Sequence, residues 1–261
     1  MTDKLYVERD GAIASIIINR PEKKNCFSLA MFQRLEDLLD ELQRDDSVKL
    51  LIVRGVDETA FSAGADITEF LEVRLHAEKA KAYNDFALGA IEKLYRFPRP
   101  TIAMIQTLAI GGGLELANAC DFRFATSGSK VGITSANIGI VYNLSSTKRL
   151  YNLIGPSKTK EMLYTAKLIS AEEGQKIGLI DYVCEPEEIE NEVDAFARRI
   201  LTKSPVANSG IKQVIQAIID GENTETEALS NMILESYSSD DYLEGIQAFM
   251  EKRKPIFLKE E

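Results

Sequence analysis

The sequence has a single histidine, three cysteines and no tryptophan among its 261 residues. His76 alone cannot build a metal site from several histidines, and no G-x-S-x-G motif supplies the nucleophile of a serine hydrolase. Cys26, Cys120 and Cys184 are widely spaced and odd in number, which indicates a reducing compartment and gives no zinc-binding spacing. We therefore expect no metal, and any chemistry must use carboxylates, hydroxyls and backbone groups.

The chain also lacks a long apolar run and an excess of positive charge. No stretch reaches the roughly 20 apolar residues that cross a bilayer. The first residues, MTDKLYVERDG, lack the apolar core of a signal peptide. The net charge of −10 argues against nucleic acid or an anionic membrane surface as the main partner. We expect a cytoplasmic protein, with neither nucleic acid nor membrane as a partner.

The stretch over residues 101–125, TIAMIQTLAIGGGLELANACDFRFA, predicts a strand, a glycine turn, a helix and a second strand. Glycines allow the backbone to approach a ligand closely. The first N–H groups of the helix have no partner within it and lie at its positive end, which suits an anion or an oxygen that becomes anionic. Walker and Rossmann phosphate loops fit less well, because the stretch lacks the Lys-Ser/Thr of the first and the third glycine of the second. A purely structural turn remains the alternative.

The remaining pattern predicts an α/β core over residues 1–195 and a helical region over residues 196–261. The helical region suits an oligomerisation element or packing onto the chain's own core. The individual predictions are a hairpin turning at Asp10 and Gly11, helices capped by Ser28 and Ser170, strands at 48–54, 130–133 and 179–184, a helical stretch at 68–96, a loop at 134–144, helices at 145–154 and 157–165, and C-terminal breaks at Gly221 and 238–241.

A second loop of small residues, 62–66, also lies between a buried strand and a helix. Parallel strands that lie side by side would bring this loop and the glycine turn to the same edge of the sheet. One N–H group from each loop could then hold a single oxygen, and each such donor lowers the barrier to an oxyanion by about 2.7–4 kcal/mol. For a thioester, that oxyanion is an enolate or a tetrahedral adduct.

The two loops, FSAGADI and AIGGGLELANACD, resemble those of the crotonase superfamily, also called the enoyl-CoA hydratase/isomerase family. The resemblance extends to INRPEKKN at 18–25 and to residues 155–183 and 249–257. It implies a crotonase-like spiral of β-β-α units with a C-terminal α-helical region. It also implies an acyl-CoA thioester substrate, no separate cofactor because CoA belongs to the substrate, and a homotrimer or a dimer of trimers.

The same resemblance implies the site residues. The thioester carbonyl oxygen would lie between the N–H groups of Ala65 and Gly112, which form the oxyanion hole. Adenine would lie near residues 63–67, and Lys252 or Lys254 would bind CoA phosphates across a subunit boundary. The full set implied for substrate and CoA binding is Ala63, Gly64, Asp66, Ile67, Thr134, Lys252 and Lys254.

The position of the first hydratase glutamate falls on Glu115, whereas the second falls on Ser135, which has no comparable proton to give near neutral pH. The segment TSANIGIVYNL and the tail SDDYLEGIQAFMEKRKPIF resemble the methylmalonyl-CoA decarboxylases of the superfamily. That resemblance implies a role for Tyr142 close to a substrate carboxylate, with Thr134 nearby.

These features lead to a predicted lyase that decarboxylates methylmalonyl-CoA or a similar short malonyl thioester, with Tyr142 and Glu115 as catalytic residues. Decarboxylation needs no base, and a neutral hydroxyl orients a carboxylate without holding it as tightly as an arginine would. Two alternatives stay open. One is an enoyl-CoA hydratase or isomerase that uses Glu115, and the other is a catalytically silent CoA-binding homologue.

Overall fold

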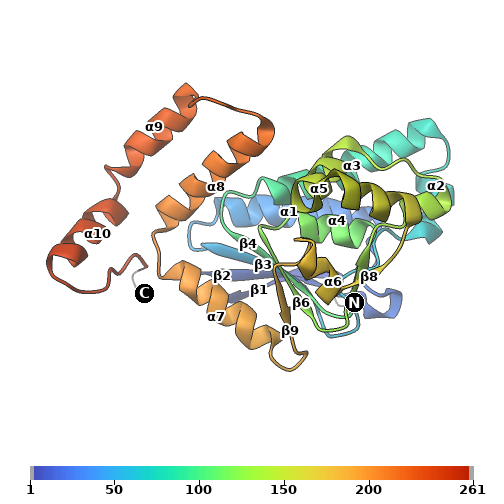
Figure 1. Cartoon of the computed structure of the whole chain (residues 1–261), viewed down its shortest axis with the longest axis horizontal. Coiled ribbons are helices and arrows are strands. Elements are labelled where there is room, and N and C mark those ends of the chain that lie inside the picture. Colours follow the sequence, from blue (N-terminus) through green and yellow to red (C-terminus); the bar gives the residue numbers. More distant parts are fainter. Residues whose placement is uncertain (1–2, 259–261) are drawn as a thin grey trace.

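The computed structural model describes residues 3–258, and a six-stranded sheet runs between layers of helices (Figure 1). Its strand order is β1-β2-β3-β4-β6-β9, with an antiparallel β1–β2 hairpin followed by parallel neighbours. A smaller sheet has the order β5-β7-β8. The strands are β1 Leu5–Asp10, β2 Ile13–Ile18, β3 Leu50–Gly55, β4 Thr101–Ile105, β5 Leu108–Ile110, β6 Phe122–Thr126, β7 Lys130–Gly132, β8 Ile169–Ser170 and β9 Tyr182–Cys184.

Both faces of the large sheet are covered, as the continuous apolar runs of β3 and β4 require. One face packs against α1 (Leu29–Arg44), α3 (Ala77–Tyr95), α4 (Gly112–Asn118) and α5 (Leu144–Thr165). The other face packs against α7 (Ile189–Leu201), whose buried Ile189, Val193 and Ala197 lie one helical turn apart. Figure 1 shows these helices on opposite sides of the sheet.

Local capping explains where several elements begin. Ser28 accepts a hydrogen bond from the amide of Met31, which fixes the start of α1. Ser170 and Glu173 form a reciprocal capping box at the start of α6 (Ala171–Lys176). The hairpin turn at Asp10 and Gly11 joins β1 to β2. These predicted caps and this turn are confirmed.

The predicted helical stretch over 68–96 is wrong as a single element. It consists of η2 (Ile67–Glu69), α2 (Phe70–Val73) and α3. His76, immediately before α3, has a φ of 71°, a left-handed conformation that cannot continue a right-handed helix. The break turns α2 away from α3 and lets both helices line one cavity, described below.

The two helices predicted at 145–154 and 157–165 are confirmed as the two halves of α5, which has a non-helical break at Gly155 (φ 71°, ψ 173°) between them. Other predicted boundaries shift. The loop predicted at 134–144 contains the short helix η3 (Ser135–Ile138), and the strand predicted at 179–184 is confined to β9. A further short helix, η1 (Pro21–Lys23), follows β2.

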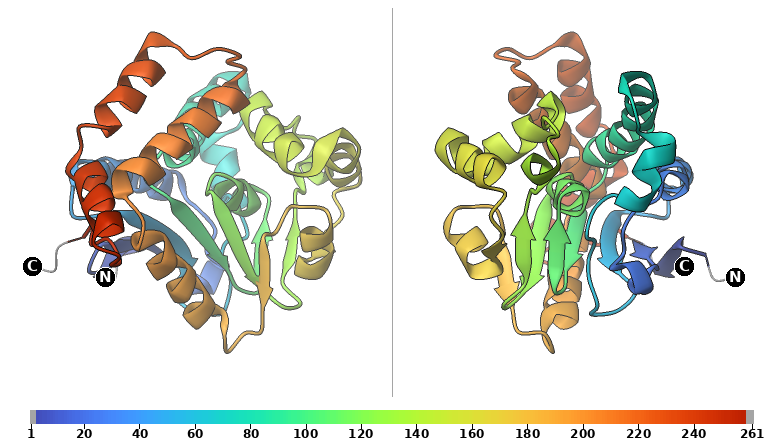
Figure 2. Two further views of the ribbon diagram at one scale, coloured as in Figure 1. Left: turned by 60° about the vertical axis from the view of Figure 1, so that its left-hand side comes forward. Right: turned by 90° about the vertical axis from the view of Figure 1, so that its right-hand side faces the viewer.

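The C-terminal helices α8 (Pro205–Asp220), α9 (Glu227–Ser236) and α10 (Asp240–Met250) project from the sheet layer (Figure 2). The boundary predicted between residues 195 and 196 falls inside α7. This helix belongs to the core, because its buried apolar stripe continues past that boundary to Ala197. Over residues 3–258, every helix is too short or too polar to cross a membrane.

Candidate active site

The two small-residue loops meet at one edge of the sheet. The loop after β3 and the strand β5 pair through an isolated bridge between Ser62 and Ala109. The amide of Ile110 donates a 3.0 Å hydrogen bond to the carbonyl of Ser62, and the amide of Phe61 donates one of 3.1 Å to Leu108. The predicted meeting of the loops is therefore confirmed.

Glycine is required where the loops touch. A Cβ atom on Gly113 would lie 2.1 Å from the carbonyl oxygen of Ser62, so no larger residue fits without moving the backbone. Gly64 has a φ of 97°, and a Cβ there would lie 2.8 Å from the carbonyl oxygen of Ile110. Both glycines allow a close approach of two backbones, which sets the spacing of the amides between them.

The amides of Ala65 and Gly112 lie at this junction and have no hydrogen-bond acceptor among residues 3–258. The Cβ position built on Gly112 lies 3.5 Å from the Ala65 nitrogen, so the two residues are neighbours. Within residues 3–258, neither amide donates a hydrogen bond to a protein acceptor. Gly112 is the first residue of α4, where an amide has no acceptor within its own helix. Two backbone donors are thus left available at one place.

The loop that carries Ala65 is held by the segment before α1. The Oγ of Ser62 donates to the carbonyl of Asn25 at 2.8 Å and accepts from the amide of Gly64 at 3.1 Å. The side-chain amide of Asn25, which is fully buried, donates to Ala60 at 2.6 Å. These buried bonds keep the loop in one conformation.

Asp66 has a different place from the one expected of a CoA-binding residue. Its carboxylate forms a 2.7 Å ion pair with Arg20 and accepts a 2.6 Å hydrogen bond from Thr68. The hydrogen bond from Thr68, together with Arg20, lowers the pKa of Asp66 below its usual value. Asp66 is buried and does not line the cavity beside the loop, so its side chain holds the loop in position and makes no wall for a ligand.

Glu115 lies on α4, one turn after Gly112, and its carboxylate is held by the start of α5. Tyr142 donates a 3.2 Å hydrogen bond to Oε2, and Ser146 donates to Oε1. The guanidinium of Arg149 lies 3.6 Å from Oε1 and also forms a 2.8 Å ion pair with Glu92. Ser146 and Arg149, which lie 31 and 34 positions after Glu115 in the sequence, thus fix the orientation of its carboxylate.

The environment makes Glu115 a weaker acid. Burial of the carboxyl raises the pKa of Glu115 above its ordinary value, although the charge of Arg149 and the hydrogen bond from Tyr142 act in the opposite direction. The pKa of Tyr142 is raised well above its usual value by burial and by the nearby Glu115 charge. Tyr142 is therefore a neutral hydrogen-bond donor, and Glu115 is suited to exchange a proton.

A cavity of about 150 Å³ opens over these groups. It is lined by the predicted residues Ala63, Gly64, Ala65, Ile67, Gly112, Glu115, Thr134 and Tyr142. Ser135 also lines it, and Glu115 supplies the single carboxyl among the lining residues of the described chain. The structure thus gathers eight predicted site residues around one short cavity.

Lys252 and Lys254 are not part of this group. Both follow α10 and are exposed, whereas the cavity lies between α2, α3 and α4. Figure 1 shows α10 and α2 at opposite ends of the molecule. Either lysine could reach a ligand in such a cavity only from another subunit.

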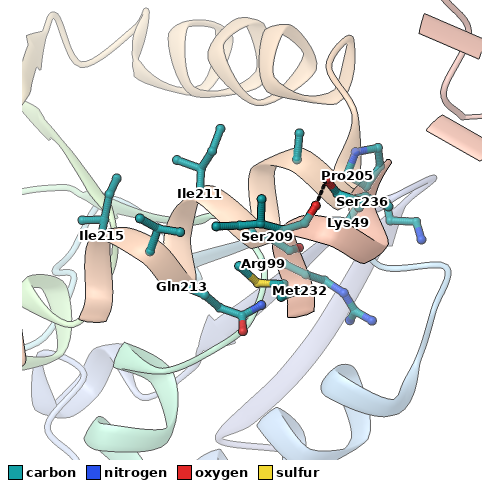
Figure 3. Close-up of a pocket in the computed structure, with 14 residues that line it drawn as sticks. Lys49, Arg99, Pro205, Ser209, Ile211, Gln213, Ile215, Met232 and Ser236 are labelled. Atoms are coloured by element: carbon teal, nitrogen blue, oxygen red, sulfur yellow. Dashed lines mark hydrogen bonds between the residues drawn. The ribbon is translucent and has the colours of Figure 1, made fainter. Parts of the chain in front are cut away.

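A larger hollow of about 590 Å³ lies between α8, α9 and the core (Figure 3). Ile211 and Ile215 from α8 and Met232 from α9 line it, together with Lys49 and Arg99. Its described lining residues include no carboxylate, histidine or cysteine. It offers apolar surface without an acid–base group, so size alone does not make it the active site.

Sequence reasoning missed Ser146, Arg149 and Arg74. Ser146 and Arg149 lie on one face of α5, and only the fold shows that this face covers Glu115. Arg74 lies in the segment predicted as continuous helix, so its place in the cavity wall could not be seen. Asn143, interpreted as a turn residue, is the N-cap of α5 and accepts from the amide of Ser146 at 2.9 Å.

The spiral of β-β-α units and the two loops with free amides define a protein of the crotonase fold. The chain belongs to the enoyl-CoA hydratase/isomerase family, whose model matches residues 8–260. It is therefore an enzyme, and the family to which it belongs acts on acyl-CoA thioesters.

Individual relatives agree with this assignment. A crotonyl-CoA hydratase of Syntrophomonas wolfei is 33% identical over 260 residues, covering 98% of each chain. A short-chain-enoyl-CoA hydratase of Clostridium acetobutylicum is 31% identical over 253 residues, covering 97% of this chain and 96% of the relative. The crystal structure of an enoyl-CoA hydratase/carnitine racemase from Magnetospirillum magneticum has a TM-score of 0.94 at 34% identity, covering 100% and 97%. None of these three is named a decarboxylase, and the predicted closeness to methylmalonyl-CoA decarboxylases gains no support from them.

Proposed function

We propose that this enzyme moves protons on a short enoyl-CoA thioester, with Glu115 as its acid–base group. The observation that carries the proposal is the position of one buried carboxyl in a cavity that is also lined by Ala65 and Gly112. The relatives named hydratases support the same substrate class. This replaces decarboxylation, our expectation from the sequence, as the main proposal.

Isomerisation of the double bond needs only these groups. The Glu115 carboxylate takes a proton from the carbon next to the thioester carbonyl, and the electron pair moves onto the carbonyl oxygen. The amides of Ala65 and Gly112 donate hydrogen bonds to the resulting enolate oxygen, worth about 2.7–4 kcal/mol each. Protonated Glu115 then returns the proton two carbons further along the chain. One carboxyl is both base and acid.

Hydration would use the same carboxyl twice. Glu115 would take a proton from water as its oxygen bonds to the β-carbon, and then give a proton to the α-carbon. Ser135, which occupies the position of a second hydratase glutamate, provides no second acid, so Glu115 would have to make both proton transfers while also activating a water molecule. Isomerisation needs one carboxyl and no water, so we favour it, and comparison of the two rates decides between them.

Decarboxylation of a short malonyl thioester is the second candidate. The uncharged Ser135 and the hydroxyls of Thr134 and Tyr142 line the cavity, and none of them repels a substrate carboxylate. The bond between the α-carbon and the carboxylate would break, its electron pair would form the enolate, and carbon dioxide would leave. Protonated Glu115 would then supply the proton that the α-carbon needs. Tyr142 already donates to Glu115, so its hydroxyl is only partly available to a substrate carboxylate.

The test is a parallel assay of the purified enzyme with a 3-enoyl-CoA, crotonyl-CoA and methylmalonyl-CoA. We expect double-bond isomerisation to be the fastest reaction. Turnover of methylmalonyl-CoA alone would overturn the main proposal in favour of the second candidate. Gly112→Pro, which removes one amide donor, should abolish each of these reactions. The control is Gly89→Ala, which substitutes a glycine of α3 and leaves the cavity unchanged. Proline at this position would break α3 and is not used.

We also propose that α8, α9 and α10 form the subunit interface of a trimer or a dimer of trimers. Exposed apolar side chains support this because a lone chain would leave them in water. They are Val206, Ile211, Ile215, Ile218, Leu234, Leu243, Ile246, Phe249 and Met250. Light scattering should give three or six times the mass of one chain, and a monomer would exclude Lys252 and Lys254 from any neighbouring site.

A further inference from the structure

The cavity beside Glu115 contains an arginine that forms no close ion pair within the described chain. Arg74, which follows α2, lines the cavity, and its guanidinium lies 4.8 Å from the centre of the Phe70 ring and 5.1 Å from that of Tyr83. One of its N–H groups donates a 2.8 Å hydrogen bond to Asn84. Among residues 3–258, no carboxylate lies within 4 Å of it. Most of its five donors thus have no protein acceptor.

A second donor in the same wall also lacks a partner. The side chain of Tyr83 is only 4% exposed and lines the cavity, and its buried hydroxyl makes no hydrogen bond within the described chain. Burial raises the pKa of Tyr83 to about 12, so the hydroxyl stays protonated at neutral pH. A buried polar group without a partner destabilises the protein, and an acceptor on a ligand would remove that cost.

The remaining wall near Arg74 is apolar and comes from Phe70, Ala87, Leu88 and Ile91. This surface suits the methylene groups of an acyl chain. An acyl chain with an apolar end would bury the guanidinium further without giving it a partner, which is costly. A chain that ends in a carboxylate would supply acceptors for Arg74 and Tyr83 together, because a guanidinium binds a carboxylate with two parallel hydrogen bonds.

We propose that Arg74 and Tyr83 bind a carboxylate on the acyl chain, so that the substrates are acyl-CoA thioesters with a carboxylate-terminated acyl group. The proposal rests on acyl-CoA binding in this cavity and adds the class of acyl group that the cavity selects. Arg74 is then a specificity-determining residue, and Glu115 remains the group that transfers the proton.

The test measures binding without turnover. Calorimetry gives the Kd of succinyl-CoA, glutaryl-CoA and butyryl-CoA, all saturated, with the wild-type protein and with Arg74→Met, Tyr83→Phe and Lys79→Met. Lys79 is an exposed cation on α3 and is the matched control. We expect at least one carboxylated thioester to bind about 10- to 100-fold more tightly than butyryl-CoA, as expected of a hydrogen-bonded charge pair.

Arg74→Met should remove this preference, Tyr83→Phe should reduce it several-fold, and Lys79→Met should leave it unchanged. Equal or tighter binding of butyryl-CoA by the wild-type protein would overturn the proposal. An equal loss for all three thioesters in Arg74→Met would also overturn it, because the cation would then serve the CoA phosphates that the thioesters share. Failure of the enoyl-CoA assays with an intact binding preference would instead reject the proposed proton transfer alone.

Discussion

The hydroxyl of Tyr142 donates a hydrogen bond to Oε2 of Glu115 across 3.2 Å, joining a residue before α5 to one inside α4. A hydrogen bond to a carboxylate stabilises its charged form and so lowers its pKa. Burial acts in the opposite direction and dominates, which leaves the pKa of Glu115 raised. Tyr142 therefore limits how far burial shifts the acid that the proposed reaction uses.

Tyr142→Phe keeps the ring and removes this donor. We expect the pKa of Glu115 to rise further, by about one unit for each 1.36 kcal/mol of lost stabilisation of the carboxylate. Since the proposed reaction starts from the ionised carboxylate, activity is lost as pH falls through this pKa. The acid limb of kcat/KM should therefore move to higher pH, and kcat at neutral pH should fall about tenfold.

A matched control for this variant is Tyr151→Phe. Tyr151 lies on α5 and is about half exposed, and its hydroxyl has no assigned role. We expect its pH profile to match that of the wild type. A Tyr142→Phe enzyme with an unmoved acid limb would show that the hydroxyl does not act through Glu115.

Glu115→Gln tests the acid–base group itself. The substitution keeps the size of the side chain and removes the proton-transfer group, so we expect kcat to fall by about 10²–10⁴-fold. Binding of a saturated acyl-CoA should change much less, because the proposed amide donors remain. Glu72→Gln, an exposed carboxylate on α2, is the control and should retain full activity. A Glu115→Gln enzyme with ordinary kcat would remove Glu115 from the mechanism.

The sequence predicted the meeting of the two loops because their strands are unmistakable apolar runs and their glycines mark a close approach. It could not predict which side chains surround Glu115. Ser146 and Arg149 occupy ordinary positions in a helix, and their role depends on the face of α5 that packs on α4. Tyr142 was expected near a substrate carboxylate, and its bond to Glu115 follows from that same packing.

The boundaries were less predictable where a single backbone angle decides them. His76 adopts a positive φ, which is uncommon for any residue other than glycine, so the break between α2 and α3 leaves little trace in the hydrophobic pattern. The same break brings Arg74 into the cavity wall. The ion pair of Asp66 could not be predicted either, because the loop motif does not show Arg20, which lies 46 residues earlier in the sequence.

Gly113→Ala tests the contact between the loops. A methyl group at this position would lie 2.1 Å from the carbonyl oxygen of Ser62, so the backbones must separate. We expect a loss of about 1–3 kcal/mol in the free energy of unfolding, as in other overpacked sites, and a large loss of activity because the amides move apart. Urea unfolding and the enoyl-CoA assay measure the two effects.

The matched substitution for this test is Gly89→Ala. Gly89 lies inside α3 with no atom within 4 Å of an added Cβ, and alanine is favoured over glycine in a helix by about 0.5–1 kcal/mol. This variant should be slightly more stable and fully active. Unchanged stability and activity in Gly113→Ala would mean that the two loops accommodate a methyl group at their contact without separating.

Asp66→Asn tests the buried ion pair that holds the Ala65 loop. Arg20 and Asp66 have side chains only 10% and 5% exposed, and removing one partner leaves a buried charge at a cost of about 3–5 kcal/mol. Because the folded-state pKa of Asp66 is lowered, its stabilisation is present above the unfolded carboxyl pKa of about 3.9 and is lost as pH falls through the folded value. The stability difference between wild type and variant should thus be largest at neutral pH and shrink below about pH 4.

Glu41→Gln, which breaks an exposed pair with Arg34, should cost under about 1 kcal/mol. A difference for Asp66→Asn that stays constant from neutral to acid pH would show that the carboxylate charge does not hold the loop.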